Sequence, residues 1–186
     1  VWDQGVWIDA ENLGPGGVLP VYAQEVVVHN NFGLIAALVA KDNTSDEIEL
    51  RIVSETGNLH VHPLGAIWPE RRGIPKFKLF QTPDSGFVYG TFVDTDERWK
   101  VLRWKDGELE IFDQPEQDLM LVDGNSRGEM IAKVSPAPAS DSGRYWNGQE
   151  WIAVDGNVYD INNRGSVLKR NSQQEYGTNS YYHHPT

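Results

Sequence analysis

The chain has 186 residues without a cysteine, so disulfides play no part in its fold. It carries 16 basic and 27 acidic residues, a formal net charge of −11, and no basic stripe interleaved with aromatics. This balance excludes nucleic acid as an expected partner and disfavours anionic membranes, and no apolar run approaches the roughly 20 residues of a membrane helix. With glycine and proline spread throughout and no helical periodicity, we expect one all-β domain over residues 1–186.

The chain opens on a short hairpin in which Trp2 and Trp7 flank a turn at Gly5. We name this pattern of strand, glycine turn and strand the tryptophan hairpin. It recurs at 101–112 and 144–154, and in a degenerate form at 50–61, where Val53 replaces the tryptophan. The Gly- and Pro-rich residues 10–25 that follow the first copy predict a connection between units.

A second pattern, which we name the turn-strand phrase, has a turn-forming residue, then a glycine, then an apolar run. Gly accepts a positive φ and Asn or Asp bonds its own backbone, so the phrase predicts a tight turn that leads into a buried strand. Its copies are residues 29–35, 82–88, 124–131 and 161–168. Their turn glycines are separated by 53, 42 and 37 residues, close to the period of a β-propeller blade. The sequence therefore predicts a propeller of four repeat units with about four strands each.

We expect strands at 26–30, 33–40, 47–54, 58–63, 76–81, 86–93, 98–105, 108–113, 118–123, 128–135, 143–147, 150–155, 157–162 and 165–171. Residues Leu34 to Val39 are apolar on both faces, which predicts an inner strand covered by neighbouring blades. Residues Glu47 to Ile52 alternate between charged and apolar, which predicts an outer strand with one wet face.

Residues 63–75 form an insertion between the first two units, and insertions in repeat arrays are often binding loops. Trp68 lies there beside Arg71 and Arg72. An exposed aromatic next to a basic pair can anchor a protein partner or an anionic sugar. The alternative is that Trp68 folds back over the end of a blade.

The two ends of the chain complement each other. The opening tryptophan hairpin has no turn-strand phrase before it, and the fourth turn-strand phrase has no tryptophan hairpin after it. We therefore expect the last blade to be shared between N- and C-terminal segments, either within one molecule or by strand exchange into a filament. Residues 171–186 are a polar C-terminal tail or a closing segment.

Residues Tyr145 to Gly148, followed by Tyr159 to Val167, resemble the HAF-type repeats of bacterial extracellular proteins. Those repeats combine an aromatic-x-Trp-x-x-Gly strand turn with an Ile-Asn-Asn-x-Gly-x-Val turn. The resemblance implies an extracellular or cell-surface β-propeller, usually with no defined catalytic activity. It supplies no active-site residues.

The repeated tryptophans are Trp2, Trp7, Trp104, Trp146 and Trp151. Tryptophans often line sugar sites, but recurrence at one place in every unit favours packing between blades. His60 and His62 share a strand face near His29 and could bind a metal, yet no third ligand is fixed by spacing. The acidic segments 94–97 and 141–142 could hold calcium, although hairpin tips are ordinarily acidic for solubility.

No nucleophile and base pairing, phosphate loop or zinc motif is visible, so we predict no catalytic residue and no cofactor. The expected function is a non-enzymatic structural or adhesive module that contacts a protein partner or copies of itself. A carbohydrate-binding propeller that uses Trp68 is the alternative. A polysaccharide hydrolase or lyase is a third hypothesis.

Overall fold

A computed structural model describes residues 2–3, 6–7, 27–31, 33–40, 47–66, 77–81, 85–94, 96–114, 118–135, 143–170 and 180–183. These residues form strands and turns only, which confirms the all-β prediction. None of the described segments is a helix able to cross a membrane.

The strands form antiparallel sheets in which neighbours in the chain are neighbours in space. The first sheet contains β3 (Val27–His29), β4 (Ile35–Ala40), β5 (Glu47–Val53) and β6 (Leu59–Ala66). The second contains β7 (Phe77–Gln81), β8 (Val88–Val93), β9 (Trp99–Lys105) and β10 (Glu108–Phe112). The third contains β11 (Asp118–Gly124), β12 (Met130–Ser135), β13 (Gly143–Trp146) and β14 (Trp151–Val154).

The fourth sheet contains three strands, β15 (Asn157–Ile161), β16 (Ser166–Arg170) and β17 (Ser180–His183). A separate hairpin pairs β1 (Trp2–Asp3) with β2 (Val6–Trp7). The turn-strand phrase thus supplies the first turn and second strand of each sheet, as predicted. The repeat architecture that the sequence indicated is present as repeated antiparallel sheets.

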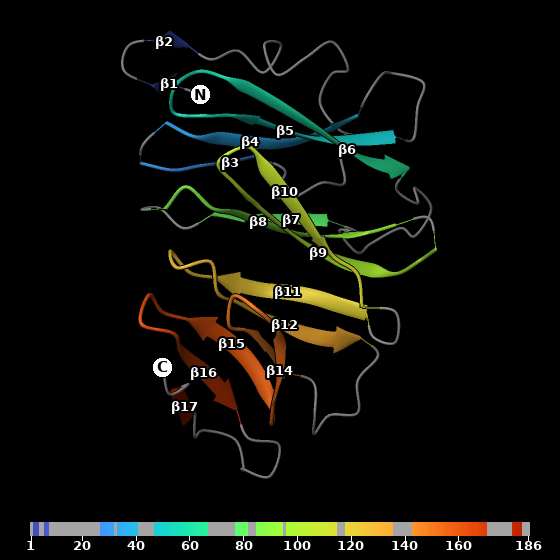
Figure 1. Cartoon of the computed structure of the whole chain (residues 1–186), viewed down its shortest axis with the longest axis vertical. Helices are drawn as coiled ribbons and strands as arrows, with labels where there is room; N and C mark the ends of the chain where they lie inside the picture. Colours follow the sequence, from blue (N-terminus) through green and yellow to red (C-terminus); the bar gives the residue numbers. More distant parts are fainter. Residues whose placement is uncertain are drawn as a thin grey trace.

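The sheets lie one after another along the long axis of the molecule, in chain order (Figure 1). Each contacts the next, β3 with β7, β11 with β8 and β9, and β15 with β11 and β12. The opening hairpin lies at one end of this stack, and β16 and β17 lie at the other end. Closure into a propeller ring is therefore not shown by the described residues.

The tail supplies a strand that the sequence did not predict. In the second and third sheets, Trp104 and Trp146 pair with the residue two positions after the turn glycine. In the fourth sheet that register position belongs to Tyr182 of β17, which pairs with Val167. The fourth turn-strand phrase consequently has a partner strand from the tail, contrary to our expectation, because a tyrosine stands where the second and third units have tryptophan. Among the described strands, β1 and β2 pair only with each other.

The core lies between successive sheets, and the inner strands contribute to it from both faces. Met130 and Ala132 pack toward the second sheet, whereas Ile131, between them, packs toward the fourth sheet. All three side chains are fully buried. Because side chains alternate across a strand, a strand buried on both faces must be apolar throughout. The same reason confirms the inner-strand prediction for Leu34 to Leu38 of the first sheet.

The outer-strand prediction for Glu47 to Ile52 was wrong, because β5 is flanked by β4 and β6. Glu49 and Arg51 are 9% and 7% exposed, so the expected wet face is buried. Arg51 donates to Glu49 Oε2 from Nε at 3.0 Å and from Nη2 at 2.7 Å. Two opposite charges can be buried together when they form an ion pair with hydrogen bonds. The alternation of charged and apolar residues in the sequence does not show whether the charged face meets water or forms such a pair. In addition, β6 runs to Ala66, so the predicted insertion at 63–75 begins as strand.

Replacement of Arg51 by methionine should lower the free energy of unfolding by about 3 kcal/mol, because Glu49 is left buried without its cation. Urea denaturation measures this change. Lys105→Met on an exposed side chain is the control and should change the value by less than about 0.5 kcal/mol. Equal effects of the two substitutions would contradict a buried, stabilising pair.

Candidate functional site

The first turns of the four sheets lie along one side of the stack, on the left in Figure 1. We name them the turn row. Its described members are residues 30–34, 85–87, 125–129 and 162–166, with residue 32 outside the described part. Hydrogen bonds join the first turn to the second and the third turn to the fourth, and side chains of β8 and β9 join the second unit to the third turn.

An asparagine closes each of three turns in the same way. Asn125 Oδ1 accepts from Arg127 N at 3.0 Å and from Glu129 N at 3.1 Å. Asn162 Oδ1 accepts from Arg164 N at 2.9 Å and from Ser166 N at 3.0 Å. These side-chain bonds add to the backbone bonds of the turn. The glycine that ends each turn is in the left-handed region, with a φ of 89° at Gly33, 87° at Gly128 and 80° at Gly165.

The same asparagine amides also bond the neighbouring unit. Asn30 Nδ2 donates to the carbonyl of Ser85 at 3.0 Å, from the first turn to the second. Asn125 Nδ2 donates to the carbonyl of Asn162 at 2.9 Å, from the third turn to the fourth. Each amide therefore stabilises its own turn with its oxygen and the stack with its nitrogen.

The third and fourth turns make two more contacts. Ser126 N donates to Asn163 Oδ1 at 3.0 Å, and Arg127 Nη1 donates to the carbonyl of Arg164 at 3.3 Å. All three bonds between these turns run in one direction, with donors on the third turn and acceptors on the fourth. The contact surface of a turn consequently has a donor side and an acceptor side.

The buried carboxylate of Glu129 forms hydrogen bonds that stabilise the third turn. Glu129 is 6% exposed, and its Oε2 accepts from Asn125 Nδ2 at 2.6 Å. Its Oε1 accepts from the Tyr145 hydroxyl at 2.9 Å and lies 3.2 Å from Arg127 Nη2. Burial, together with the Glu129 carboxylate, raises the pKa of Tyr145 to about 12. A Cβ at Gly165 would lie 3.1 Å from Glu129 Oε2, so the fourth turn fits closely over this carboxylate.

The second and third units meet through different side chains. The Tyr89 hydroxyl donates to the carbonyl of Asn125 at 2.5 Å, and Arg103 Nη1 donates to the carbonyl of Gly128 at 2.8 Å. Burial raises the pKa of Tyr89 well above its ordinary value, which keeps the phenol protonated and able to donate. Here the aromatic and guanidinium groups of the second sheet take the place of the asparagine amide.

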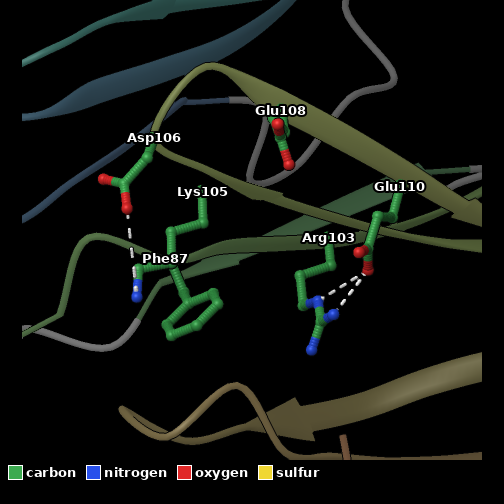
Figure 2. A pocket seen from close by; sticks show the side chains of 6 residues that line it. All are labelled: Phe87, Arg103, Lys105, Asp106, Glu108 and Glu110. Atoms are coloured by element: carbon green, nitrogen blue, oxygen red, sulfur yellow. Dashed lines mark hydrogen bonds and ion pairs between the residues drawn. The ribbon is translucent and has the colours of Figure 1, made fainter. Parts of the chain in front are cut away.

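A hollow of about 240 Å³ lies beside this junction and is lined by Phe87, Arg103, Lys105, Asp106, Glu108 and Glu110. Figure 2 shows Glu110 turned toward Arg103 and Asp106 turned toward Lys105. Glu110 Oε2 accepts from both Nε and Nη2 of Arg103, at 3.0 and 2.5 Å. Lys105 Nζ lies 4.6 Å from the centre of the Phe87 ring. Since its cations already face carboxylates or a ring, the hollow indicates no particular ligand.

The repeated tryptophans Trp104, Trp146 and Trp151 pack between units, as expected from their recurrence. Trp104 is 2% exposed, and its Nε1 donates to His62 Nε2 at 3.1 Å. Trp146 and Trp151 lie 5.5 Å apart between ring centres, with the Phe112 ring of the second sheet 4.7 Å from Trp146. The indole nitrogens of Trp146 and Trp151 are buried, with no hydrogen-bond partner among the described residues. The side chains of Trp2 and Trp7 lie outside the described residues.

The histidine pair has a packing role in the same contact. The ring of His60 meets the Trp104 ring edge-on, with 5.5 Å between centres. Because His62 Nε2 accepts the indole proton, that nitrogen is not available to a metal. Burial and the neighbouring His60 lower the pKa of His62, which favours this neutral acceptor form. In the described part of the chain, no three His, Asp or Glu side chains are placed to share a metal ion.

Asp94 is the first carboxylate of the segment 94–97 that was predicted to hold calcium, and it lies in a turn. Asp94 Oδ1 accepts from the backbone N of Asp96 and Arg98, at 3.0 and 3.1 Å. Asp94 Oδ2 lies 2.6 Å from Lys100 Nζ. Both oxygens are therefore engaged within the hairpin. The second calcium candidate, 141–142, lies outside the described residues, as do Trp68, Arg71 and Arg72, so the binding site predicted there stays a prediction.

A pair of acidic groups joins the third and fourth sheets, and sequence reasoning missed it. Asp123 and Asp160 each follow a register shift in the first strand of their sheet. Asp123 Oδ2 accepts from Ile161 N of the fourth sheet at 3.3 Å. Burial and a hydrogen bond with the Asp160 carboxyl raise the pKa of Asp123 to about 6. The available signal was an aspartate two residues before the turn asparagine in both units.

Comparison of the chain with known protein families, with curated proteins and with solved structures found no match.

Replacement of Asn125 by aspartate should lower the free energy of unfolding by about 2 to 4 kcal/mol. The carboxylate keeps the acceptor that closes the turn, but it loses the donor to Glu129 and Asn162 and faces the Glu129 carboxylate. Asn147→Asp is the matched control, since Asn147 Oδ1 closes a turn at Gln149 and Glu150 without a bond to another unit. Denaturation curves that shift equally for both variants would contradict the role of the Asn125 donor.

The Asp123 and Asp160 pair predicts that stability decreases as the pH rises from about 4 to about 7. The pKa of Asp123 is raised in the folded state, so the folded chain binds the extra proton and loses that stabilisation as the pH passes about 6. Asp160→Asn should flatten this part of the profile, because it removes the neighbouring carboxyl group. Urea midpoints at pH 4.5, 6 and 7.5 measure the slope.

The control for this profile is Asp155→Asn on the exposed Asp155 side chain, which should keep the wild-type slope. An unchanged slope in Asp160→Asn would show that the pair does not act as described.

Proposed function

We propose that this chain is a non-enzymatic structural or adhesive repeat module of the cell exterior, which acts by binding protein surfaces, including those of its own copies. The observation that carries the proposal is the turn row, in which units bind one another through bonds directed from one turn to the next. A surface that recognises a neighbouring unit within the chain has the chemistry to recognise the same unit in another chain.

The burial pattern supports the same function. Trp104, Trp146 and the His60 and His62 pair are engaged in contacts between units, and the fourth turn fits closely over the Glu129 carboxylate at Gly165. Such side chains serve an architecture in which each sheet needs a neighbour to bury its apolar face. The exterior location rests on the resemblance to HAF-type repeats.

The proposal includes a four-unit propeller-like array whose last blade is shared between N- and C-terminal segments of different molecules. The opening hairpin has Trp2 opposite Trp7, the same spacing as Trp146 opposite Trp151 in the third sheet. The fourth sheet has one strand fewer than the first three among the described residues. Because an edge strand is a template for pairing, β17 of one copy would receive the opening hairpin of the next.

The proposed function predicts that the purified protein self-associates in a concentration-dependent manner. Light scattering coupled to size-exclusion chromatography should give a mass above that of one chain, which rises with the loading concentration. Moderate salt is needed, because the net charge of −11 opposes association at low ionic strength. A mass equal to one chain at every concentration up to the millimolar range would contradict self-association.

A further inference from the structure

The contact between the third and fourth turns shows which hydrogen-bond donors one turn presents and which acceptors the next turn presents. The third turn donates from Asn125 Nδ2, from the Ser126 backbone N and from the Arg127 guanidinium. The fourth turn accepts at the Asn162 carbonyl, at Asn163 Oδ1 and at the Arg164 carbonyl. The donor pattern is thus Asn-x-Arg, and the acceptor pattern is a pair of asparagines.

The fourth turn also carries the donor pattern on its other side. Its Asn162 and Arg164 stand where the third turn has Asn125 and Arg127, each pair ahead of the turn glycine. The side chains of Asn162, Asn163 and Arg164 are exposed. Asn162 Oδ1 closes its own turn, while its Nδ2 and the Arg164 guanidinium have no partner among the described residues. The last turn of the row therefore presents an oriented set of donors to solvent.

The first turn of the chain carries the matching acceptor pattern. Asn30 and Asn31 stand where the fourth turn has Asn162 and Asn163. Asn31 is exposed. Asn30 Oδ1 accepts from Leu34 N at 2.9 Å, as Asn162 Oδ1 accepts from Ser166 N, four residues after the asparagine in both turns. The third turn has Ser126 in place of the second asparagine, and a serine lacks the amide oxygen that accepts in the fourth turn.

We infer that residues 162–164 of one copy bind residues 30–31 of a second copy, so that the turn row continues from molecule to molecule. Asn162 Nδ2 and the backbone N of Asn163 donate to the Asn30 carbonyl and to Asn31 Oδ1 of the neighbour. Arg164 adds a cation to a contact between chains that are otherwise acidic. The inference rests on the proposed function and assigns its binding site.

Sedimentation velocity of the full chain over a concentration series tests the inference. Asn162→Asp keeps the oxygen that closes the turn and replaces the outward donor by a carboxylate oxygen, which repels the neighbour's carbonyl. The dissociation constant for self-association should rise by about tenfold or more. Arg164→Ala is the second variant and should weaken association in the same direction. Asn147→Asp has the same change of charge in another turn and should associate as the wild type does.

The outcomes separate the inference from the proposed function. A monomeric wild type would overturn self-association and this site together. A wild type that associates, with Asn162→Asp unchanged, would overturn the site and leave self-association standing through another surface. Equal weakening by Asn162→Asp and Asn147→Asp would mark a general charge effect and would also overturn the site. Unchanged thermal melts of the variants exclude misfolding as the cause.

Discussion

An asparagine side chain has an acceptor and a donor on one planar group, and the stack depends on the use of both. The oxygen of Asn125 closes a tight turn in place of a backbone group, which fixes the amide plane. The nitrogen on the other side of that plane then points at the next unit, where it reaches the Asn162 carbonyl. Turn closure therefore orients the bond between units in advance, and little additional entropy is lost when the units meet.

The packing of the sheets follows from the same arrangement. Turns held in line along one side keep the sheets in register, so that Met130 faces the second sheet and Ile131 faces the fourth. Apolar burial supplies most of the favourable free energy, but it is not directional. The polar contacts of Asn30 and Asn125 restrict which faces meet and in which order. In this stack the first turn is therefore fitted to the second, and the third turn to the fourth.

Much of the fold could be predicted from the sequence, because asparagine and glycine mark the turns and apolar runs mark the strands between them. The buried Glu49 and Arg51 pair was missed, since alternation looks the same whether the charged face meets water or a partner. The strand β17 was missed because Tyr182 has neither a tryptophan nor a turn glycine beside it. Whether the units close into a ring depends on relations between sheets that no local pattern encodes.

The candidate site was only partly visible. The sequence predicted the turn-strand phrase as a turn that begins a buried strand, without a role in binding. It placed binding at Trp68, Arg71 and Arg72, which lie outside the described residues. That Asn125 and Asn162 also join units depends on the third turn lying against the fourth. The repeated Asn-x-Arg before a turn glycine was present in the sequence, but its meaning required the geometry. The pairing of Asp123 with Asp160 likewise required the register shifts in β11 and β15.

The most direct test of the central claim is hydrogen exchange of the asparagine side-chain amides, measured by NMR on the uniformly labelled protein. The amide protons of Asn30 and Asn125 should exchange markedly more slowly than those of Asn147, because only the first two donate to another unit. Exchange of the Asn125 amide as fast as that of Asn147 would contradict the claim that turn asparagines hold the units together.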